Sequence, residues 1–278
     1  MRLKHFAPTT IAVLALIVVG VDFAAPARAD DIAPVRVLAA GSLRTAIGQE
    51  AAAFEHQFGV RVDSAFGPSG LLRERIEKGE AADLFASADM GNPRALSQAG
   101  KAGPVVLFAR NRLCAFVRPG LWTASNILLG TMLDPQIKLG TSTPKADPAG
   151  DYTWSMFAKA DTFRPGSGAL LEAKALQLIG GPNSAAPPAG TDVFAWHLRE
   201  GHADIFIGYC SATAAFTKDL PGGTVIGMPN DLATGADYGL TVLSTKNRNA
   251  EALMFFIISE DGQKILQQNG FEAPLLPP

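Results

Sequence analysis

The chain has 278 residues and a formal net charge of −2, from 24 basic and 26 acidic side chains. A slightly acidic chain without blocks of lysine or arginine excludes the broad basic surface that nucleic-acid binding requires, so we expect no nucleic-acid partner. Its length allows one large domain or two of ordinary size.

The first 29 residues have the pattern of a secretory signal peptide. Arg2 and Lys4 precede an apolar run over 11–21, and the Ala-Arg-Ala sequence at 27–29 provides a cleavage site. The apolar run is too short for a permanent membrane helix, and no later segment has ~18 uninterrupted apolar residues. Removing this segment takes away three basic residues and one acidic residue, which moves the net charge from −2 to −4. We expect an exported, soluble protein in the periplasm that begins at Asp30.

Short apolar runs alternate with helical patterns in the first third of the mature chain. Residues 35–40 are typical of a buried parallel strand, and Ser42 is predicted to cap a helix that ends at Gly59. Strands are expected at 60–66 and 82–86, and helices at 69–79 and 93–100. This alternation indicates an α/β fold with a doubly wound, mainly parallel sheet, in which ligands bind beyond the carboxyl ends of the strands.

The same alternation continues through residues 121–236. The terminal helical pattern has no strand after it and needs a sheet to cover. We therefore expect two lobes joined by two crossings, near residues 115 and 238. Lobe I would contain residues 30–114 and 238–278, and lobe II residues 115–237. The expected strands are 113–117, 137–140, 204–209 and 238–243, and the expected helices begin near 149, 192 and 249.

The two cysteines, Cys114 and Cys210, each lie in or next to an apolar, strand-like run. Export to an oxidising compartment favours a disulfide between them. The alternative is two separate buried thiols.

Two strand-to-helix turns point to an anion site. Ser42 and Ser69 each stand at a helix start, where free backbone N–H groups and a hydroxyl can hold an anion. Ala149 and Thr191 begin two further predicted helices, and Tyr209 ends a strand with its phenol available. Neither of the first two turns contains a lysine or arginine, so we expect an oxyanion held by neutral dipoles. The alternative is that the three hydroxyl residues only cap their helices.

Other chemistry has weaker support. His56, His197 and His202 lack the spacing of a metal site, so no bound cation is expected, and the last two are expected on a solvated helix face and loop. The sequence Gly-Pro-Ser-Gly-Leu at 67–71 lacks the final glycine of a serine hydrolase elbow. An exported hydrolase using Ser69 would need His56 or His202 beside it.

Several segments of this chain resemble the periplasmic molybdate-binding proteins of ABC transporters, within the two-lobed solute-binding superfamily. The resemblance covers nearly the whole mature chain. Its most specific segment is Ala-Asp-Leu-Phe-Ala-Ser-Ala-Asp at 82–89. The other segments are 39–43, 66–70, 148–150, 201–204 with Tyr209, 238–240 and the closing helix 259–271.

The resemblance implies a type II periplasmic binding protein that holds molybdate or tungstate between its lobes. Ser42 and Ser69 would contribute hydroxyl and N–H groups, Ala149 and Thr191 backbone N–H groups, and Tyr209 its phenol. The protein would be a monomer without cofactor or catalytic activity that delivers its ligand to a membrane permease. Sulfate or phosphate is the alternative ligand, and ferric iron is disfavoured because adjacent tyrosines are absent.

The chain departs from the family pattern at Gly41 and Pro68, in the first two turns. Asp147, Asp151 and Asp192 cluster by the turns of the second lobe. Because some relatives bind tungstate with added carboxylate oxygens, an aspartate such as Asp147 is a candidate ligand of the metal centre. The alternative is that these carboxylates stabilise helix starts and face water.

Overall fold

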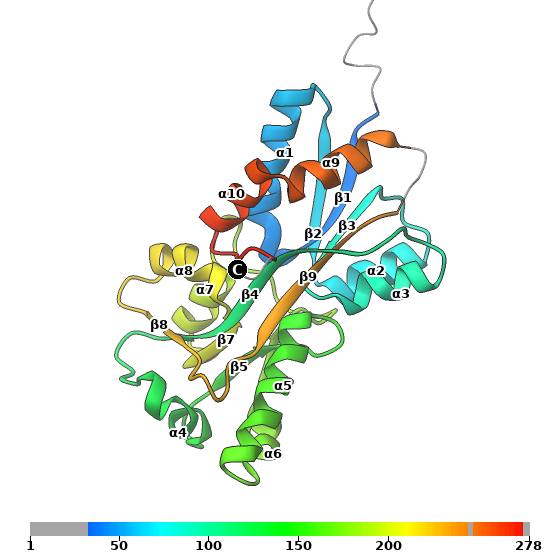
Figure 1. The fold of residues 1–278 in the computed structure, drawn as a ribbon. Helices are drawn as coiled ribbons and strands as arrows, with labels where there is room; N and C mark the ends of the chain where they lie inside the picture. Colours follow the sequence, from blue (N-terminus) through cyan, green and yellow to red (C-terminus); the bar gives the residue numbers. More distant parts are fainter. Residues whose placement is uncertain (1–32, 244–246, 275–278) are drawn as a thin grey trace, which may run out of the picture.

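The computed structural model describes residues 33–243 and 247–274, and the expected signal peptide lies outside these ranges. The described strands join in the order β2-β1-β3-β9-β4-β7-β5-β6, with β8 paired to β4. The sheet curves through both halves of the molecule (Figure 1). The strands are β1 (Val35–Ala40), β2 (Val62–Gly67), β3 (Leu84–Ser87), β4 (Val106–Val117), β5 (Leu139–Ser142), β6 (Leu176–Ile179), β7 (Ile205–Tyr209), β8 (Thr224–Gly227) and β9 (Gly235–Val242).

Helices cover both faces of the sheet. The first half contains β1, β2, β3 and β9, and the second half contains β5, β6, β7 and β8. In the first half, α1, α9 and α10 lie on one side of β1 and β9, and α2 and α3 lie on the other (Figure 1). In the second half, α5 packs against β5 with α6 beside α5, and α7 packs against β7 with α8 beside α7. The helices are α1 (Arg44–Phe58), α2 (Ser69–Glu77), α3 (Gly91–Gln98), α4 (Leu128–Leu133), α5 (Pro148–Phe163), α6 (Ser167–Lys174), α7 (Val193–Arg199), α8 (Thr213–Asp219), α9 (Arg248–Ile258) and α10 (Glu260–Gln268).

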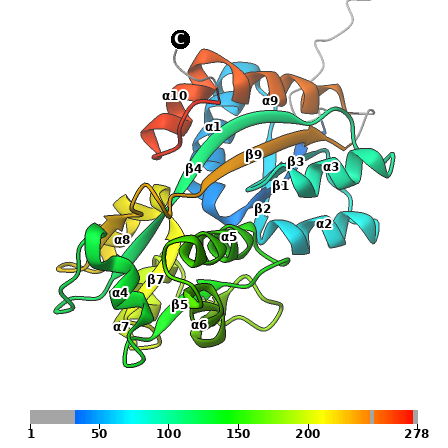
Figure 2. The same ribbon diagram turned by 60° about the horizontal axis from the view of Figure 1, so that its bottom comes forward.

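The longest strand, β4, connects the two halves. Its first part pairs antiparallel with β9 as far as Arg112, opposite Gly235. From Leu113, opposite Tyr209, it pairs with β7 instead. One continuous strand therefore belongs to both parts of the sheet (Figure 2). The chain returns between β8 and β9, and the lobe boundaries expected at 115 and 238 stay a prediction.

Parallel pairs lie toward the outside of the sheet and antiparallel pairs at its centre. β1 runs parallel to β2 and β3, and β5 runs parallel to β6 and β7. β9 and β4 are antiparallel to their neighbours because the chain crosses between the halves in opposite directions. The carboxyl ends of β1, β2, β3, β5 and β7 consequently face the junction between the halves.

The single terminal helix expected from the sequence is two helices. Ser259 interrupts it and caps α10, because its hydroxyl accepts a hydrogen bond from the Gly262 N–H at 3.4 Å. Gly262 also permits close packing, since a Cβ there would lie 2.3 Å from the Phe256 carbonyl oxygen. In the part of the chain that the structure covers, no helix combines the length and apolar character needed to cross a membrane.

Cys114 and Cys210 form a disulfide, which confirms the favoured prediction. Cys114 lies on β4 and Cys210 directly follows β7. The two strands are paired through Leu113 and Tyr209, the residues that precede the cysteines, so the sheet brings the two sulfurs together.

Candidate functional site

A chain of polar contacts crosses the junction between the halves at the point where β4 changes partner. The hydroxyls of Ser42 and Tyr238 share a hydrogen bond of 3.0 Å. Asn111 on β4 donates from Nδ2 to the Tyr238 hydroxyl at 3.4 Å and to the Ser211 Oγ at 2.8 Å. Ser42 follows β1, Tyr238 belongs to β9 and Ser211 follows β7, so the contacts link strands of both halves.

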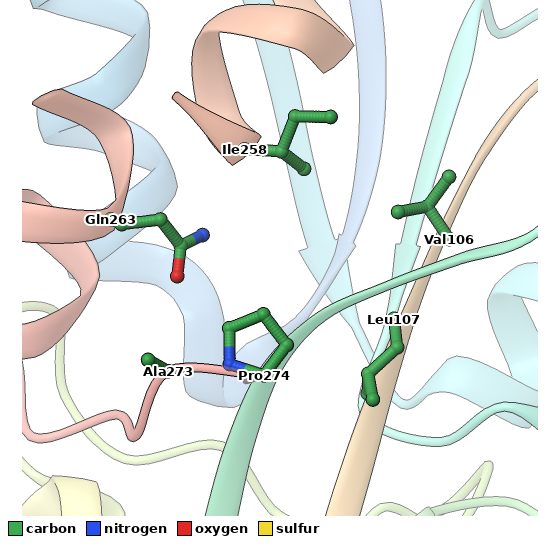
Figure 3. A pocket seen from close by; sticks show the side chains of 6 residues that line it. All are labelled: Val106, Leu107, Ile258, Gln263, Ala273 and Pro274. Atoms are coloured by element: carbon green, nitrogen blue, oxygen red, sulfur yellow. The ribbon is translucent and has the colours of Figure 1, made fainter. Parts of the chain in front are cut away.

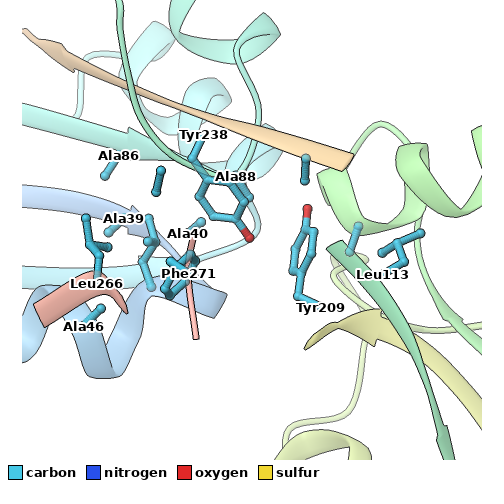
Figure 4. Close-up of a cluster of buried hydrophobic side chains, with 14 of the residues drawn as sticks. Ala39, Ala40, Ala46, Ala86, Ala88, Leu113, Tyr209, Tyr238, Leu266 and Phe271 are labelled. Atoms are coloured by element: carbon cyan, nitrogen blue, oxygen red, sulfur yellow. The ribbon is translucent and has the colours of Figure 1, made fainter. Parts of the chain in front are cut away.

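The three tyrosines of the chain, Tyr152, Tyr209 and Tyr238, gather at this junction. The Tyr209 ring centroid lies 5.6 Å from that of Tyr238 and 6.5 Å from that of Tyr152. Figure 4 shows the hydroxyls of Tyr209 and Tyr238 directed into the same space. Tyr209 is 4 % exposed, yet its hydroxyl has no hydrogen-bond partner among the described residues. A buried hydroxyl without a partner is costly, so it marks a place for a bound group.

Ser69 lies at the start of α2, fully buried. Its Oγ accepts a hydrogen bond of 3.1 Å from the Ala88 N–H, which leaves the hydroxyl proton available. The next residue, Gly70, donates its N–H to the Ala146 carbonyl of the second half at 2.9 Å. The start of α2 therefore touches the segment that leads into α5.

Neither serine caps its helix, so the expectation that Ser42 is an N-cap is wrong. The 3₁₀ turn η2 (Gly41–Leu43) precedes α1, and neither element has a side-chain cap at its start. At α2 the N-cap position is Pro68. Both hydroxyls instead make contacts with residues far away in the sequence.

The start of α5 carries its own carboxylate. Asp147 occupies the N-cap, and its Oδ1 accepts a hydrogen bond of 3.0 Å from the Ala149 N–H. Its side chain packs against Gly180, where a Cβ would lie 2.4 Å from the Asp147 Cβ. Asp147 is therefore half-buried, whereas Asp151 is exposed. In this arrangement the Ala149 N–H is already satisfied.

Burial dominates the electrostatics of the junction. Burial, with smaller contributions from the nearby carboxylates of Asp151 and Asp89, raises the pKa of Asp147 to about 6. Burial also raises the pKa of Tyr209 and Tyr238 well above the ordinary value. Both phenols are consequently neutral hydrogen-bond donors at any physiological pH. The carboxylate of Asp147 contributes to both shifts, so it lies within electrostatic reach of both phenols.

One cation borders the serine turns. Arg44 follows Ser42 by two residues, and its guanidinium lies 4.7 Å from the centroid of the Phe66 ring, just before the second turn. This cation–π contact keeps an exposed positive charge beside the two helix starts. Arg44 lies just outside the first turn and was not among the predicted site residues.

Thr191 lies in the loop before α7, and its N–H donates to the Pro188 carbonyl at 3.1 Å. The cap of α7 is Asp192, which accepts a hydrogen bond of 2.8 Å from the Ala195 N–H. Burial raises the pKa of Asp192 to about 6. No contact between described residues joins Thr191 to the cluster of Ser42, Tyr209 and Tyr238, so its role in a site stays a prediction.

Tyr238, Asn111 and Tyr152 were not among the site residues predicted from the sequence. Tyr238 stands at the crossing expected near residue 238 and Tyr152 just after the helix start expected near 149, which were their only sequence signals, and Asn111 had none. The structure adds no support for the serine hydrolase alternative, since Ser69 has no histidine partner among its described contacts. An apolar pocket also opens between β4, α9, α10 and residues 273–274 (Figure 3). It is lined by Val106, Leu107, Ile258, Gln263, Ala273 and Pro274.

Comparison with known proteins identifies the family. The model of the bacterial extracellular solute-binding proteins matches residues 35–272. The chain belongs to this family. An uncharacterized protein of Pasteurella multocida is 37 % identical over 243 residues, which is 85 % of this chain and 98 % of that protein.

Two solved structures share the fold. The periplasmic molybdate-binding protein of Azotobacter vinelandii has a TM-score of 0.70 at 20 % identity and covers 87 % of this chain and 100 % of its own. The sulfate-binding protein of Mycobacterium tuberculosis has a TM-score of 0.69 at 20 % identity and covers 87 % of each chain. The fold is therefore the two-lobed type II periplasmic binding fold, as the sequence predicted. At this identity the likeness concerns the fold and leaves the ligand open.

Proposed function

We propose that this solute-binding protein captures a small oxyanion, molybdate or tungstate first, at the junction between its halves. In this proposal it works in the periplasm as a monomer, without cofactor or catalytic step, and delivers the ligand to the permease of an ABC transporter. The observation that carries the proposal is the buried, unpartnered hydroxyl of Tyr209, directed into the space that Tyr238 also faces. Family membership and the two similar binding proteins support it.

The available donors suit an oxyanion. The hydroxyl protons of Tyr209 and Ser69 and the helix start at Ser42 are neutral donors, and the Arg44 guanidinium supplies a positive charge nearby. A dianion buried without a paired cation needs several convergent donors of this kind. Ala149 can join them only if its N–H is shared with, or released by, Asp147. Thr191 is retained as a backbone donor on the resemblance alone.

A second candidate is hydrogenphosphate, and the observation that favours it is Asp147. An ionised carboxylate beside the site repels a fully ionised oxyanion such as molybdate or sulfate. The same carboxylate accepts a hydrogen bond from an oxyanion that keeps a proton. Hydrogenphosphate would then bind better than sulfate, although both have the same charge and a similar shape.

The test is calorimetric titration of the ligand-stripped chain from residue 30 with molybdate, tungstate, sulfate and phosphate. Tight one-to-one binding of molybdate and tungstate, with sulfate silent, is the expected result. Tighter binding of phosphate or sulfate would replace molybdate as the ligand. Binding of none of the four would refute the oxyanion proposal.

Variants connect the binding to the site. Tyr209→Phe, Ser42→Ala and Ser69→Ala should each weaken binding by ~1–3 kcal/mol, as expected for a lost hydrogen bond to a charged group. Ser155→Ala is the matched control, since its exposed hydroxyl only bonds the Asp151 carbonyl within α5. Equal affinities for Ser155→Ala and Tyr209→Phe would place the ligand elsewhere.

A further inference from the structure

Two histidines on α7 and its following loop face each other. The Nδ1 atoms of His197 and His202 lie 3.2 Å apart. His197 is 2 % exposed, so the expectation that it lies on a solvated helix face is wrong, whereas His202 is exposed in the loop as expected. Sequence spacing gave no hint of a pair, because residues five apart lie on different sides of a continuous helix.

The end of α7 explains the pairing. The His202 N–H donates to the His197 carbonyl at 2.9 Å, and the Gly201 N–H donates to the Leu198 carbonyl at 3.2 Å. Gly201 has a φ of 67°, in the left-handed region. These are the two hydrogen bonds and the glycine of a Schellman motif, which brings together the side chains at its C3 and C″ positions. Here those side chains are the two imidazoles, and the backbone holds them in place.

We propose that His197 and His202 form a two-imidazole site for a divalent late transition metal ion of the Ni²⁺, Cu²⁺ and Zn²⁺ class. With metal–nitrogen bonds of about 2.0–2.1 Å, two nitrogens in tetrahedral coordination stand about 3.3 Å apart. The observed 3.2 Å separation of the Nδ1 atoms therefore lets one ion bind both with little movement. Imidazole nitrogen suits these ions, and water completes the coordination.

Metal binding requires a particular ring tautomer of each histidine. Both Nδ1 atoms must be unprotonated to bind a metal ion. The Nε2 of His197 has no partner among the described residues and can carry the ring proton. His202 is exposed, so its own proton can move to Nε2, where water accepts it.

Charged and aromatic side chains surround the histidine pair. Arg199 and Glu200 lie on the same turn, and their side chains pair with each other at 3.8 Å. Phe206 stacks against the inner side of His197 at 5.7 Å. Trp196 contacts both imidazoles, with ring centroids 4.6 Å from His197 and 5.3 Å from His202. This tryptophan is consequently a built-in reporter of metal binding.

The experiment uses the untagged chain from residue 30, with Trp122 and Trp154 replaced by phenylalanine so that emission comes from Trp196. Addition of Ni²⁺ should quench this emission in a saturable one-to-one manner, and excess Zn²⁺ should restore it by displacing Ni²⁺. His202→Ala, a change at an exposed position, should weaken the quenching by roughly tenfold or more through the loss of one ligand. His56→Ala, on α1, is the control and should behave as the parent.

Two further readouts separate the site from general effects of metal ions. Zn²⁺ should raise the melting temperature of the parent and of His56→Ala but not of His202→Ala, because an ion bound only by the native state stabilises it. Removing the ion with EDTA should restore the emission of Trp196. Equal quenching in His202→Ala and the parent, or quenching without saturation, would overturn the proposal.

Discussion

Glu50 is expected to make the stability of the protein depend on pH, because its carboxyl group is buried without a hydrogen-bond partner. It lies on the inner face of α1 with no exposed surface, and neither carboxyl oxygen has a hydrogen-bond partner among the described residues. Burial raises the pKa of Glu50 from 4.5 to about 9. The native state therefore keeps a proton that the unfolded chain loses above pH 4.5.

The sign of the effect follows from proton linkage. The native state binds more protons than the unfolded state between pH 4.5 and 9, so stability falls as pH rises through that window. From pH 4.5 to 7 the loss is about 3 kcal/mol, at ~1.4 kcal/mol for each pH unit. For a protein of this size the loss corresponds to a fall of about 6–12 °C in melting temperature.

Glu50→Gln keeps the shape of the side chain and removes its ionisation. The free energies of unfolding of the variant and the parent are measured by urea unfolding at pH 4.5 and at pH 7. We expect the difference, variant minus parent, to be about 3 kcal/mol larger at pH 7 than at pH 4.5. Comparing two pH values cancels any constant packing effect. Glu172→Gln on the exposed face of α6 is the control and should show no such difference. A pH-independent offset between Glu50→Gln and the parent would refute the reasoning, because Glu50 would then titrate normally.

Three further changes test the junction and the disulfide. Gly70→Ala would place a Cβ 2.2 Å from a carbonyl oxygen of the second half, so ligand affinity measured by calorimetry should fall at least tenfold. Gly48→Ala is the control, because nothing lies within 4 Å of the added Cβ, and it should leave the affinity unchanged. Tyr238→Phe removes a hydroxyl bonded to two side chains and should cost about 1–3 kcal/mol in urea unfolding, whereas no loss would mean that those contacts are absent in solution. Reducing the Cys114–Cys210 disulfide, which spans 96 residues, should lower the free energy of unfolding by up to ~4–5 kcal/mol in the chain-entropy account. An unfolding midpoint that does not change in reductant would contradict this.

The sequence predicted the parts of the molecule that local patterns determine. The strand-to-helix turns at Ser42 and Ser69 follow from short apolar runs, small residues and helical spacing, all within about ten positions. The disulfide could be predicted because export favours pairing of the two cysteines that the chain contains. These features depend on neighbouring residues or on composition.

The contacts of the candidate site depend on residues that are far apart in the chain. Ser42 and Tyr238 are separated by 196 positions, and Asn111 and Ser211 by 100. A pattern read along the chain cannot show that these hydroxyls and amides meet, so Ser42 was expected to have a cap role that it does not fill. His197 and His202 illustrate a shorter-range limit, since only the geometry of the Schellman turn brings their rings together.

The position of the polar contacts suggests how ligand capture and the arrangement of the halves are connected. Tyr238 belongs to a strand of the first half, yet Asn111 links its hydroxyl to Ser211 of the second half. Asn111 lies on β4 two positions before the strand changes partner, so a change in the angle between the halves must alter the geometry at this residue. A ligand that bonds Tyr209 fills the space beside the Tyr238 hydroxyl and so acts on the same contacts. The affinity of the site should therefore depend on Asn111 even though its amide is already occupied by protein partners.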